Sequence, residues 1–354
     1  MDDLRAQFPV LERIEYLNAG TTGPVPRRGY EAAVESLRRQ HDEGRSGHEF
    51  FEHCIERIDL LRTRVAALMG AALGEIALTG STTDGVNGAL GALELGPGDE
   101  VLTSDEEHPG VLAPLGRLRQ RLGVAVRVAP FAEIPAAVGP ETRVVACSHV
   151  SWKTGRVVDS AALAATDALV LLDGAQGLGA VPVDVPALGC DFYAASGQKW
   201  LCGPNGLGYL HVRADLAAGL PSPWPGYPVL AEPARAFELS LHPDARRLGI
   251  GFPPIHHVEW ALVALDVLEN AGFDDIHRRA ATLAATLAAE LGERARPRGA
   301  STLVSWEVAE PEQEVARLRE AGFVLRDLPG TGTVRASVGA WSNEAELERL
   351  ALLA

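Results

Sequence analysis

The sequence predicts an α/β protein with a mostly parallel sheet, followed by a smaller α+β domain. Between about residues 75 and 212, short apolar runs alternate with patterns typical of helices. Several of these runs are continuously apolar, which is expected of strands that helices cover on both faces. The chain also has 354 residues, more than a single domain usually contains, so a second domain is expected.

The elements of the larger domain follow from the apolar runs in chain order. Seven runs predict strands, at residues 75–79, 100–103, 124–128, 143–147, 168–173, 192–194 and 208–212. Helix-like patterns lie between some of them, at 83–93, 110–122 and 160–165. Residues 219–254 are rich in proline and predict a long extended segment. Loops of that length usually serve a function or form an interface.

The C-terminal residues predict a small α+β domain. An amphipathic helix is expected at 257–270 and a second helix at 274–291. A strand, a helix and a strand then follow at 302–307, 312–321 and 334–338. We therefore predict a large domain at residues 15–255 and a small domain made of residues 1–14 and 256–354.

The charge and the cysteines argue against several classes of protein. The formal net charge of −15 disfavours binding to nucleic acid or to an anionic membrane, since both need a positive surface. The four cysteines lack CxxC spacing, which argues against a zinc site or a disulfide framework. No signal peptide is evident, and no apolar run reaches the roughly 20 residues that span a bilayer. We expect a cytoplasmic protein without metal, nucleic-acid or membrane partners.

Lys199 is the strongest indication of chemistry. It stands in the small-residue run 196–200 (SGQKW), which a glycine-rich stretch follows. Upstream, an apolar run ends at Asp173 and brings a carboxylate to the end of a strand, where open α/β sheets bind ligands. Pyridoxal 5′-phosphate (PLP) requires a lysine that forms a Schiff base and a carboxylate that keeps the pyridine nitrogen protonated. The sequence therefore predicts a PLP enzyme.

Other residues near strand ends fit the same cofactor. Residues 79–85 (TGSTTDG) open a helix, where hydroxyls and backbone N–H groups bind a phosphate, although Ser or Thr there is also routine capping. Gln176 is placed to donate to the phenolic oxygen of the ring. His108 is placed to stack on the ring and to shuttle a proton, although a lone histidine in a loop is more often only solvated.

The substrate side is open to more than one interpretation. Arg335 lies on a late strand, where its forked guanidinium matches the carboxylate of an amino acid. A surface ion pair is an equally good explanation of that arginine. His48, Trp152 and Trp224 are further candidates to line the pocket, although ordinary packing is the better explanation for each of them singly.

Together these residues resemble the class V aminotransferase family of fold type I PLP enzymes, which includes cysteine desulfurases, selenocysteine lyases and isopenicillin N epimerase-like proteins. The resemblance runs from residues 16–20 (YLNAG) to Arg335 and is most specific at 173–208. It implies a homodimer with active sites at its interface. Carried over by position, it implies that Lys199 forms the Schiff base, Asp173 binds the ring nitrogen, Gln176 binds the phenolic oxygen and His108 stacks on the ring. It implies that the phosphate is held by Thr82, Thr83, Ser196 and Gln198. It also implies that Arg335 binds the substrate carboxylate and that Asn18 and His48 lie near the partner's site.

The sequence departs from the desulfurase pattern at three places. Desulfurases carry a nucleophilic cysteine on the loop before the late strand, and residues 327–333 hold none, which disfavours a protein-bound persulfide. Phe252 stands where the partner-subunit Gly-Thr-Pro of the family has a threonine that reaches the phosphate. Trp152 stands where desulfurases have an asparagine beside the cofactor, so the substrate side is expected to differ.

The reaction stays open among a few alternatives. We expect Lys199 to remove the Cα proton of a bound α-amino acid, after which β-elimination, transamination and epimerisation diverge. Elimination from a cysteine-like substrate, as by a C–S lyase, is the first hypothesis, and transamination is the second. A scaffold without turnover is the non-enzymatic alternative, which the presence of Lys199, Asp173 and Arg335 disfavours. No GxGxxG follows an early strand, so a Rossmann dehydrogenase is a weaker alternative.

Overall fold

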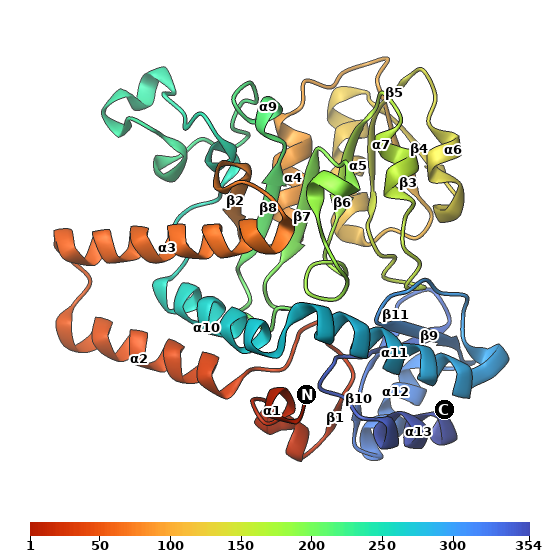
Figure 1. Cartoon of the computed structure of the whole chain (residues 1–354). Helices are drawn as coiled ribbons and strands as arrows, with labels where there is room; N and C mark the ends of the chain where they lie inside the picture. The colour runs from red at the N-terminus through yellow and green to blue at the C-terminus, as the bar shows by residue number, and fades with distance from the viewer.

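The computed structural model describes residues 1–354, and its larger part is built on a seven-stranded sheet (Figure 1). The strand order is β2-β8-β7-β6-β5-β3-β4. β8 runs antiparallel to its neighbours β2 and β7, and the other adjacent strands pair in parallel. This confirms the predicted mostly parallel sheet. The strands are β2 (Ile76–Thr79), β3 (Glu100–Ser104), β4 (Ala125–Ala129), β5 (Thr142–Ser148), β6 (Leu169–Asp173), β7 (Phe192–Ser196) and β8 (Gly208–Val212), and each coincides with a predicted run.

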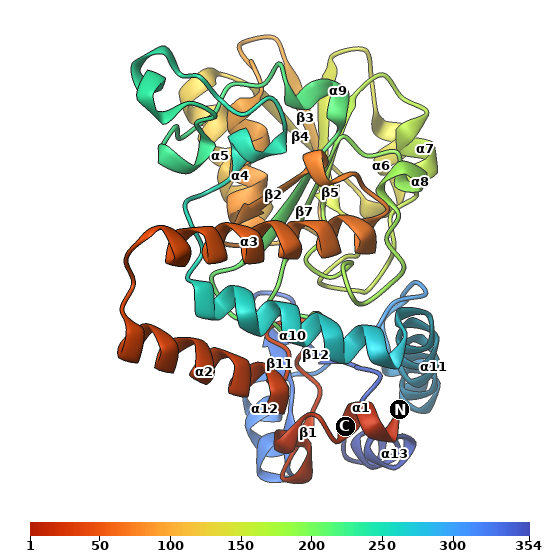
Figure 2. The ribbon, with the colours of Figure 1, turned by 60° about the vertical axis from the view of Figure 1, so that its left-hand side comes forward.

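Helices cover both faces of this sheet (Figure 2). α4 (Thr82–Ala92) and α5 (Pro109–Leu122) pack on one face and α3 (His48–Met69) on the other, and α10 (Ile255–Ala271) packs against α3. Leu171 and Leu172 of β6 belong to opposite hydrophobic clusters, because successive side chains of a strand point to opposite faces. The strand is therefore apolar at every position before Asp173. Shorter helices complete the connections: α6 (Ile134–Ala137), α7 (Ser160–Ala164), α8 (Val185–Leu188) and α9 (Ala214–Ala217).

The C-terminal part forms a small α+β unit with its own core. β9 (Leu303–Glu307), β11 (Arg326–Leu328) and β12 (Thr333–Ser337) make an antiparallel sheet in the order β11-β12-β9. A separate hydrophobic cluster joins α11, β9, β12 and α13, with Trp306 and Leu287 fully buried in it. The predicted strands β9 and β12 and helix α12 are present, whereas β11 was not expected. The helices of this unit are α11 (Phe273–Leu291), α12 (Pro311–Glu320) and α13 (Glu344–Leu353).

The N-terminal residues add elements that the sequence patterns did not predict. α1 (Asp2–Arg5) leads to β1 (Glu15–Tyr16), which pairs in parallel with β10 (Phe323–Val324) of the small unit. The long helix α2 (Arg27–Glu43) and α3 then form a hairpin whose turn uses two glycines with positive φ, Gly44 and Gly47. The hairpin extends to one side of the molecule, and α10 packs against both of its helices (Figures 1 and 2).

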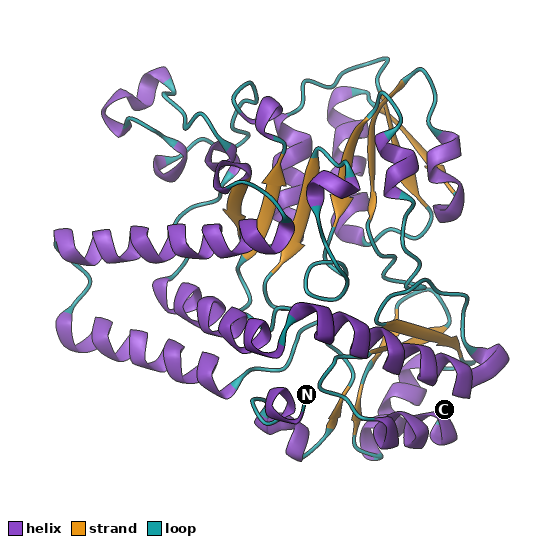
Figure 3. Ribbon diagram, viewed as in Figure 1, coloured by secondary structure: helices purple, strands orange, loops and turns teal.

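The proline-rich segment 219–254 contains no strand. Its only regular structure is three short 3-10 helices, Tyr227–Val229, Pro233–Glu238 and Ala245–Leu248, and the rest is loop (Figure 3). Phe237 at its outer edge is fully exposed. The division at residues 15 and 255 stays a prediction, and β1, which begins the proposed large domain, pairs with β10 of the small one.

Two further structural facts concern membranes and metal ions. No helix combines the length and the hydrophobicity that a membrane crossing requires. No group of three or more His, Cys, Asp or Glu side chains is arranged to hold a metal ion.

Candidate active site

A cavity of about 190 Å³ lies at the carboxyl edge of the sheet, between the sheet and the β11–β12 hairpin. Open α/β sheets bind ligands at this edge. The structure brings ten of the thirteen predicted site residues to this cavity: Thr82, Thr83, His108, Trp152, Asp173, Gln176, Ser196, Gln198, Lys199 and Arg335. They come from segments far apart in the sequence, so their convergence is a property of the fold.

Lys199 is held in a tight turn after β7. Cys202 N donates to Lys199 O at 3.1 Å, and Gly203 N donates to Gly197 O at 2.9 Å. Gly23 lies against the same turn, and its N–H donates to Gln198 O at 2.7 Å. A Cβ at position 23 would lie 2.1 Å from Lys199 O, so the close approach of the two backbones requires glycine there. The small residues flanking Lys199 therefore fix its position.

Burial and charge give Lys199 and Asp173 unusual properties. Burial lowers the pKa of Lys199 to about 8, and the Asp173 carboxylate opposes part of that change. Burial also raises the pKa of Asp173, while Lys199 and a hydrogen bond from Ala175 N, at 2.9 Å, favour its ionised form. A buried lysine with a pKa near the working pH is a nucleophile and a base, as catalytic lysines are.

The N-terminus of α4 offers hydroxyls and N–H groups to an anion. Ser81 is the N-cap, because its Oγ accepts from Asp84 N at 3.1 Å, so Thr82 and Thr83 are not needed for capping. Thr82 Oγ1 lies 2.5 Å from Ser196 Oγ, which also accepts from Thr82 N at 3.1 Å. Gln198 lines the same space, and its amide Nε2 is a donor suited to an anion. These groups favour the phosphate interpretation over simple capping.

His108 is the N-cap residue of α5, and its imidazole ring is neutral. Its Nδ1 accepts from Gly110 N at 3.0 Å, so the proton of the neutral ring belongs on Nε2. Burial, and then the charges of Lys199 and two arginines, lower the pKa of His108 to about 4. Its ring meets that of Trp152 edge to face, with centroids 5.1 Å apart and an interplanar angle of 85°.

Gln176 is fixed at both ends of its amide. Nε2 donates to Gly20 O at 2.7 Å, and Oε1 accepts from Trp200 Nε1 at 3.0 Å. The amide nitrogen has a second N–H, so one donor is left for a ligand in the cavity that Gln176 lines.

Arg335 is a buried cation with free donors. Only 1% of the residue is exposed. Nη1 donates to Trp152 O at 2.8 Å, whereas Nε and Nη2 have no hydrogen-bond partner. Burial, and then the charge of Arg326, lower the pKa of Arg335 to about 9. The alternative of a surface ion pair is wrong, because Arg335 is buried and has no carboxylate partner.

The sequence patterns missed Arg326, which also lines the cavity. It begins β11 and lies opposite Arg335 of β12 in the antiparallel pair. The glycine-containing stretch 329–332 (PGTG) between two short runs is a hairpin signal that points to this pairing.

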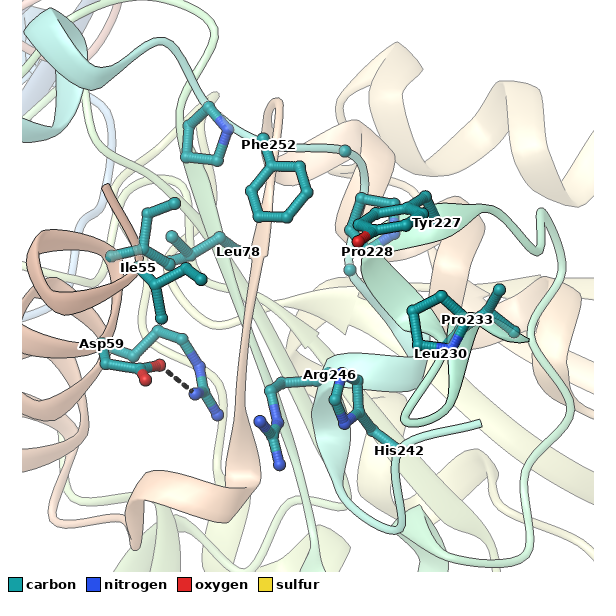
Figure 4. A pocket seen from close by; sticks show the side chains of 15 residues that line it. Ile55, Asp59, Leu78, Tyr227, Pro228, Leu230, Pro233, His242, Arg246 and Phe252 are labelled. Atoms are coloured by element: carbon teal, nitrogen blue, oxygen red, sulfur yellow. Dashed lines mark hydrogen bonds and ion pairs between the residues drawn. The ribbon is translucent and has the colours of Figure 1, made fainter. Parts of the chain in front are cut away.

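Three predicted residues lie outside the cavity, and one of them, Trp224, lines a separate cavity beside α4 and α5. His48 begins α3 with 86% of its side chain exposed and is paired with Glu52. Asn18 is half-buried two residues before Gly20, which lines the cavity, and its buried Oδ1 has no hydrogen-bond partner. A role for either residue in a second subunit's site stays a prediction. Phe252 lies in a different cavity, of about 230 Å³, between α3 and the proline-rich segment (Figure 4).

The residues of the Lys199 cavity fit PLP. A buried primary amine lies near a buried carboxylate, and hydroxyls gather at a helix N-terminus. The unpartnered buried atoms Gln198 Oε1, Arg335 Nε and Arg335 Nη2 belong to residues that line the same space. Buried polar groups without partners are rare in proteins, so they indicate a polar ligand.

Comparisons with known proteins agree with this fit. Residues 15–305 match the model of the aminotransferase class-V family. A cysteine desulfurase of Cronobacter sakazakii is 30% identical over 315 residues, which cover 82% of this chain and 77% of that protein. A mutant of C-DES with glycine covalently linked to the PLP cofactor is 26% identical, with a TM-score of 0.91 over 98% of both chains. A complex of the cystine C–S lyase C-DES with its reaction product cysteine persulfide is 25% identical, with a TM-score of 0.91 over 98% of both chains.

The chain belongs to the aminotransferase class-V family, and it is a PLP-dependent enzyme of fold type I. The family and the cofactor predicted from the residues around Lys199 are confirmed.

Proposed function

We propose that this member of the family cleaves the C–S bond of a sulfur-containing α-amino acid by β-elimination, without a persulfide on the protein. The observation that carries the proposal is a single cavity that combines Lys199 and Asp173 with the unpartnered donors of Arg335. The relatives are cysteine desulfurases, and one structural neighbour is a cystine C–S lyase, which supports sulfur chemistry at this site.

Seven of the residues that line the cavity would hold the cofactor. Lys199 would carry it covalently, Asp173 would bind the ring nitrogen, and Gln176 would donate its free N–H to the phenolic oxygen. The phosphate would be held by Thr82, Thr83, Ser196 and Gln198 at the N-terminus of α4. When bound, PLP supplies an electron-withdrawing ring that stabilises negative charge at Cα.

Arg335 orients the substrate. Its Nε and Nη2 are unpartnered, and the bond from Nη1 to Trp152 O fixes the plane of the guanidinium. A carboxylate matches such a fork with two charge-assisted hydrogen bonds. We assign this position to the α-carboxylate, which leaves the Cα–H bond and the side chain to face the groups around Lys199.

Lys199 Nζ takes the proton from Cα. Because burial lowers its pKa to about 8, a substantial fraction of the free amine is neutral near neutral pH. His108 is neutral with its proton on Nε2, so it serves as a hydrogen-bond donor and as a packing surface rather than as a base. Trp152 lies beside it and helps to exclude water from the cavity.

No cysteine is available to receive the sulfur. None of the four cysteines lines the cavity, and the β11–β12 hairpin contains none. Burial raises the pKa of Cys147, Cys190 and Cys202, which keeps them as unreactive thiols. The sulfur must therefore leave on a small molecule.

The PLP-loaded protein should release pyruvate from a sulfur amino acid in amounts that match the sulfur released. The assay pairs lactate dehydrogenase detection of pyruvate with a colorimetric measurement of sulfide or persulfide, across L-cysteine, L-cystine and L-alanine. Conversion of the cofactor to its amine form without release of sulfur would instead establish transamination. Loss of optical activity without either product would establish epimerisation, and both outcomes overturn the lyase proposal.

We also propose that two chains pair through the face that carries Phe252. Tyr227 and Phe252 are more than half exposed, and so is Ile55 of α3. They line the cavity of Figure 4 together with Leu78 and Leu230, so an apolar surface faces solvent beside the α2–α3 hairpin. Light scattering should give twice the chain mass of 37.5 kDa, and a monomer would contradict the pairing.

The cytoplasmic location stays a prediction, which cell fractionation would test.

A further inference from the structure

Glu107 is a buried carboxylate to which the proposed function gives no role. It lies in the turn between β3 and α5, directly before His108, and only 2% of the residue is exposed. Its side chain does not line the Lys199 cavity. Glutamate is rarely buried to this extent unless a cation pairs with it, so the position of Glu107 calls for a physical reason.

Two serines hold this carboxylate with three hydrogen bonds. Ser104 Oγ donates to Oε1 at 2.5 Å, Ser148 N donates to Oε1 at 2.9 Å, and Ser148 Oγ donates to Oε2 at 2.6 Å. Ser104 ends β3 and Ser148 ends β5, so Glu107 joins the carboxyl ends of two neighbouring strands. No arginine, lysine or histidine side chain pairs with it, and no cation influences its pKa.

The next strand brings Asp173 close to the Glu107 carboxylate. Asp173 of β6 is the register partner of Ser148 in the parallel β5–β6 pair. The thiol of Cys147 on β5 is influenced by both carboxylates, because burial, and then the charges of Glu107 and Asp173, raise its pKa. Two carboxylates therefore lie near each other at this edge of the sheet, and only Asp173 lines the Lys199 cavity.

The charge of Glu107 is not compensated within the chain. Burial raises the pKa of Glu107 to about 7 against the hydrogen bonds of the serines, which lower it, and the charge of Asp173 adds to the rise. The charge of Lys199 acts on Asp173 and not on Glu107, and the adjacent His108 is neutral. Without a cofactor, about half of the Glu107 side chains are therefore protonated near pH 7.

We propose that Glu107 is a positioning residue of the cofactor site, which acts through Asp173 to keep the ring nitrogen of PLP protonated. Asp173 would contact that nitrogen, and a second negative charge beside Asp173 makes loss of the ring proton less favourable. The positive ring in turn supplies the charge that the two carboxylates lack, so bound PLP favours the ionised form of Glu107. The inference rests on the cofactor of the family and is independent of the reaction that follows at Cα.

PLP binding and the ionisation of Glu107 are then linked. The positive ring lowers the pKa of Glu107 from its value of about 7, so binding below pH 7 releases a proton from this carboxyl group. The contribution of Glu107 to PLP binding is therefore complete above pH 7 and is lost as the pH falls below it. A carboxylate that only joined β3 to β5 would give no such linkage.

The first test uses Glu107→Gln, which removes the charge and keeps the shape. The amide oxygen accepts from Ser148 N and the amide nitrogen donates to Ser148 Oγ, so the contacts with β5 are retained. The PLP-loaded protein is dialysed to equilibrium against fixed concentrations of free PLP, which gives the dissociation constant. The ratio of this constant in the variant to that in the unmodified protein should rise about tenfold from pH 6 to pH 8. Titration of the PLP phosphate cancels in this ratio.

Glu106→Gln is the matched control, because it removes a carboxylate from the same turn. Thr154 Oγ1 donates to Glu106 Oε2 at 2.6 Å, and Arg156 pairs with Oε1 at 3.5 Å, so this carboxylate already has a cation partner. Its ratio of dissociation constants should stay the same from pH 6 to pH 8. A rise equal to that of Glu107→Gln would show that any charge in this turn has the effect, and it would contradict the assignment to Glu107.

The second test observes the ring nitrogen directly. Nuclear magnetic resonance of the protein loaded with ring-¹⁵N-labelled PLP records whether this nitrogen carries a proton. As the pH is raised, the ring should lose its proton about one pH unit earlier in Glu107→Gln than in the unmodified protein. This measurement needs no substrate and no turnover.

A further variant tests the linkage without altering Glu107. Ser148→Ala removes the hydrogen bond to Oε2, which favours the ionised carboxylate, so the pH below which PLP binding weakens should move above 7. If this pH does not move in Ser148→Ala, and the ratio stays constant and the ring nitrogen unchanged in Glu107→Gln, Glu107 only joins β3 to β5 and the proposal is wrong. The lyase proposal stands or fails separately, because none of these measurements involves a sulfur substrate.

Discussion

The two sides of the Lys199 cavity differ in how their polar groups are compensated. On the sheet side, the polar groups are mostly paired within the protein: Thr82 with Ser196, Asp173 with Ala175 N, and Gln176 with Gly20 and Trp200. On the hairpin side, Arg335 has two unpartnered donors and faces Arg326. The sheet side is organised for a cofactor that stays bound, whereas the hairpin side is organised for anions that arrive and leave with each turnover.

Replacing Lys199 acts on the chemistry of the sheet side and should have the largest effect. Lys199→Ala removes the base at Cα and the attachment point of the cofactor, so pyruvate release should fall by about 10³-fold or more. Lys153→Ala is the matched control, because Lys153 is the only other lysine and lies outside this cavity. If the Lys199→Ala protein retained most of its turnover, Lys199 would not be the catalytic base.

Replacing Arg335 acts on the hairpin side and should affect binding of every substrate. Arg335→Gln removes a fork that binds the α-carboxylate, and kcat/KM should fall by roughly 100-fold for L-cysteine and for L-cystine. The measurement is steady-state kinetics, with thermal unfolding to confirm that the variant is folded. An unchanged kcat/KM in the folded variant would show that Arg335 does not bind the α-carboxylate.

The pH dependence of cofactor attachment tests the electrostatics of the sheet side. The neutral amine is the reactive form, and burial lowers the pKa of Lys199 to about 8 from 10.5. The rate at which cofactor-free protein binds PLP covalently should therefore rise by about tenfold per pH unit below pH 8 and level off above it. Asp173→Asn removes a charge that raises this pKa, so the plateau should begin at lower pH. Stopped-flow absorbance measures the rate, and a plateau only above pH 10 would contradict the account.

The smallest expected effect concerns Phe252, on the face through which we propose that two chains pair. Phe252→Thr introduces the hydroxyl that the family's Gly-Thr-Pro has at this position, so it should slow the loss of PLP during dialysis by about fivefold, as one added hydrogen bond does. Phe237→Thr is the control, because Phe237 is fully exposed on the same proline-rich segment. A faster loss of PLP accompanied by dissociation to monomers would show that Phe252 acts in chain pairing instead.

The sheet side of the cavity was predictable because its signals are local in the sequence. Asp173 ends an apolar run, and Lys199 stands in a small-residue turn directly after another strand. The strands themselves were predictable because burial on both faces makes most of their positions apolar.

The hairpin side was less predictable because its chemistry depends on pairing. Arg326 and Arg335 meet only through the register of β11 with β12, and β11 has only three residues, too few for a periodic pattern. The α2–α3 hairpin was missed for another reason. The apolar side chains of α2 include Tyr30 and Val34, which are exposed in the single chain. The helix therefore lacks the continuous apolar face by which a core helix is predicted.

The central claim is that Lys199 is the residue to which PLP attaches, and reduction with borohydride tests it most directly. The chain has only two lysines, so the assignment is a choice between Lys199 and Lys153. The account predicts that borohydride reduction of the PLP-loaded protein, followed by peptide mass spectrometry, places one phosphopyridoxyl group per chain on Lys199. A label on Lys153, or no label on either lysine, would contradict it.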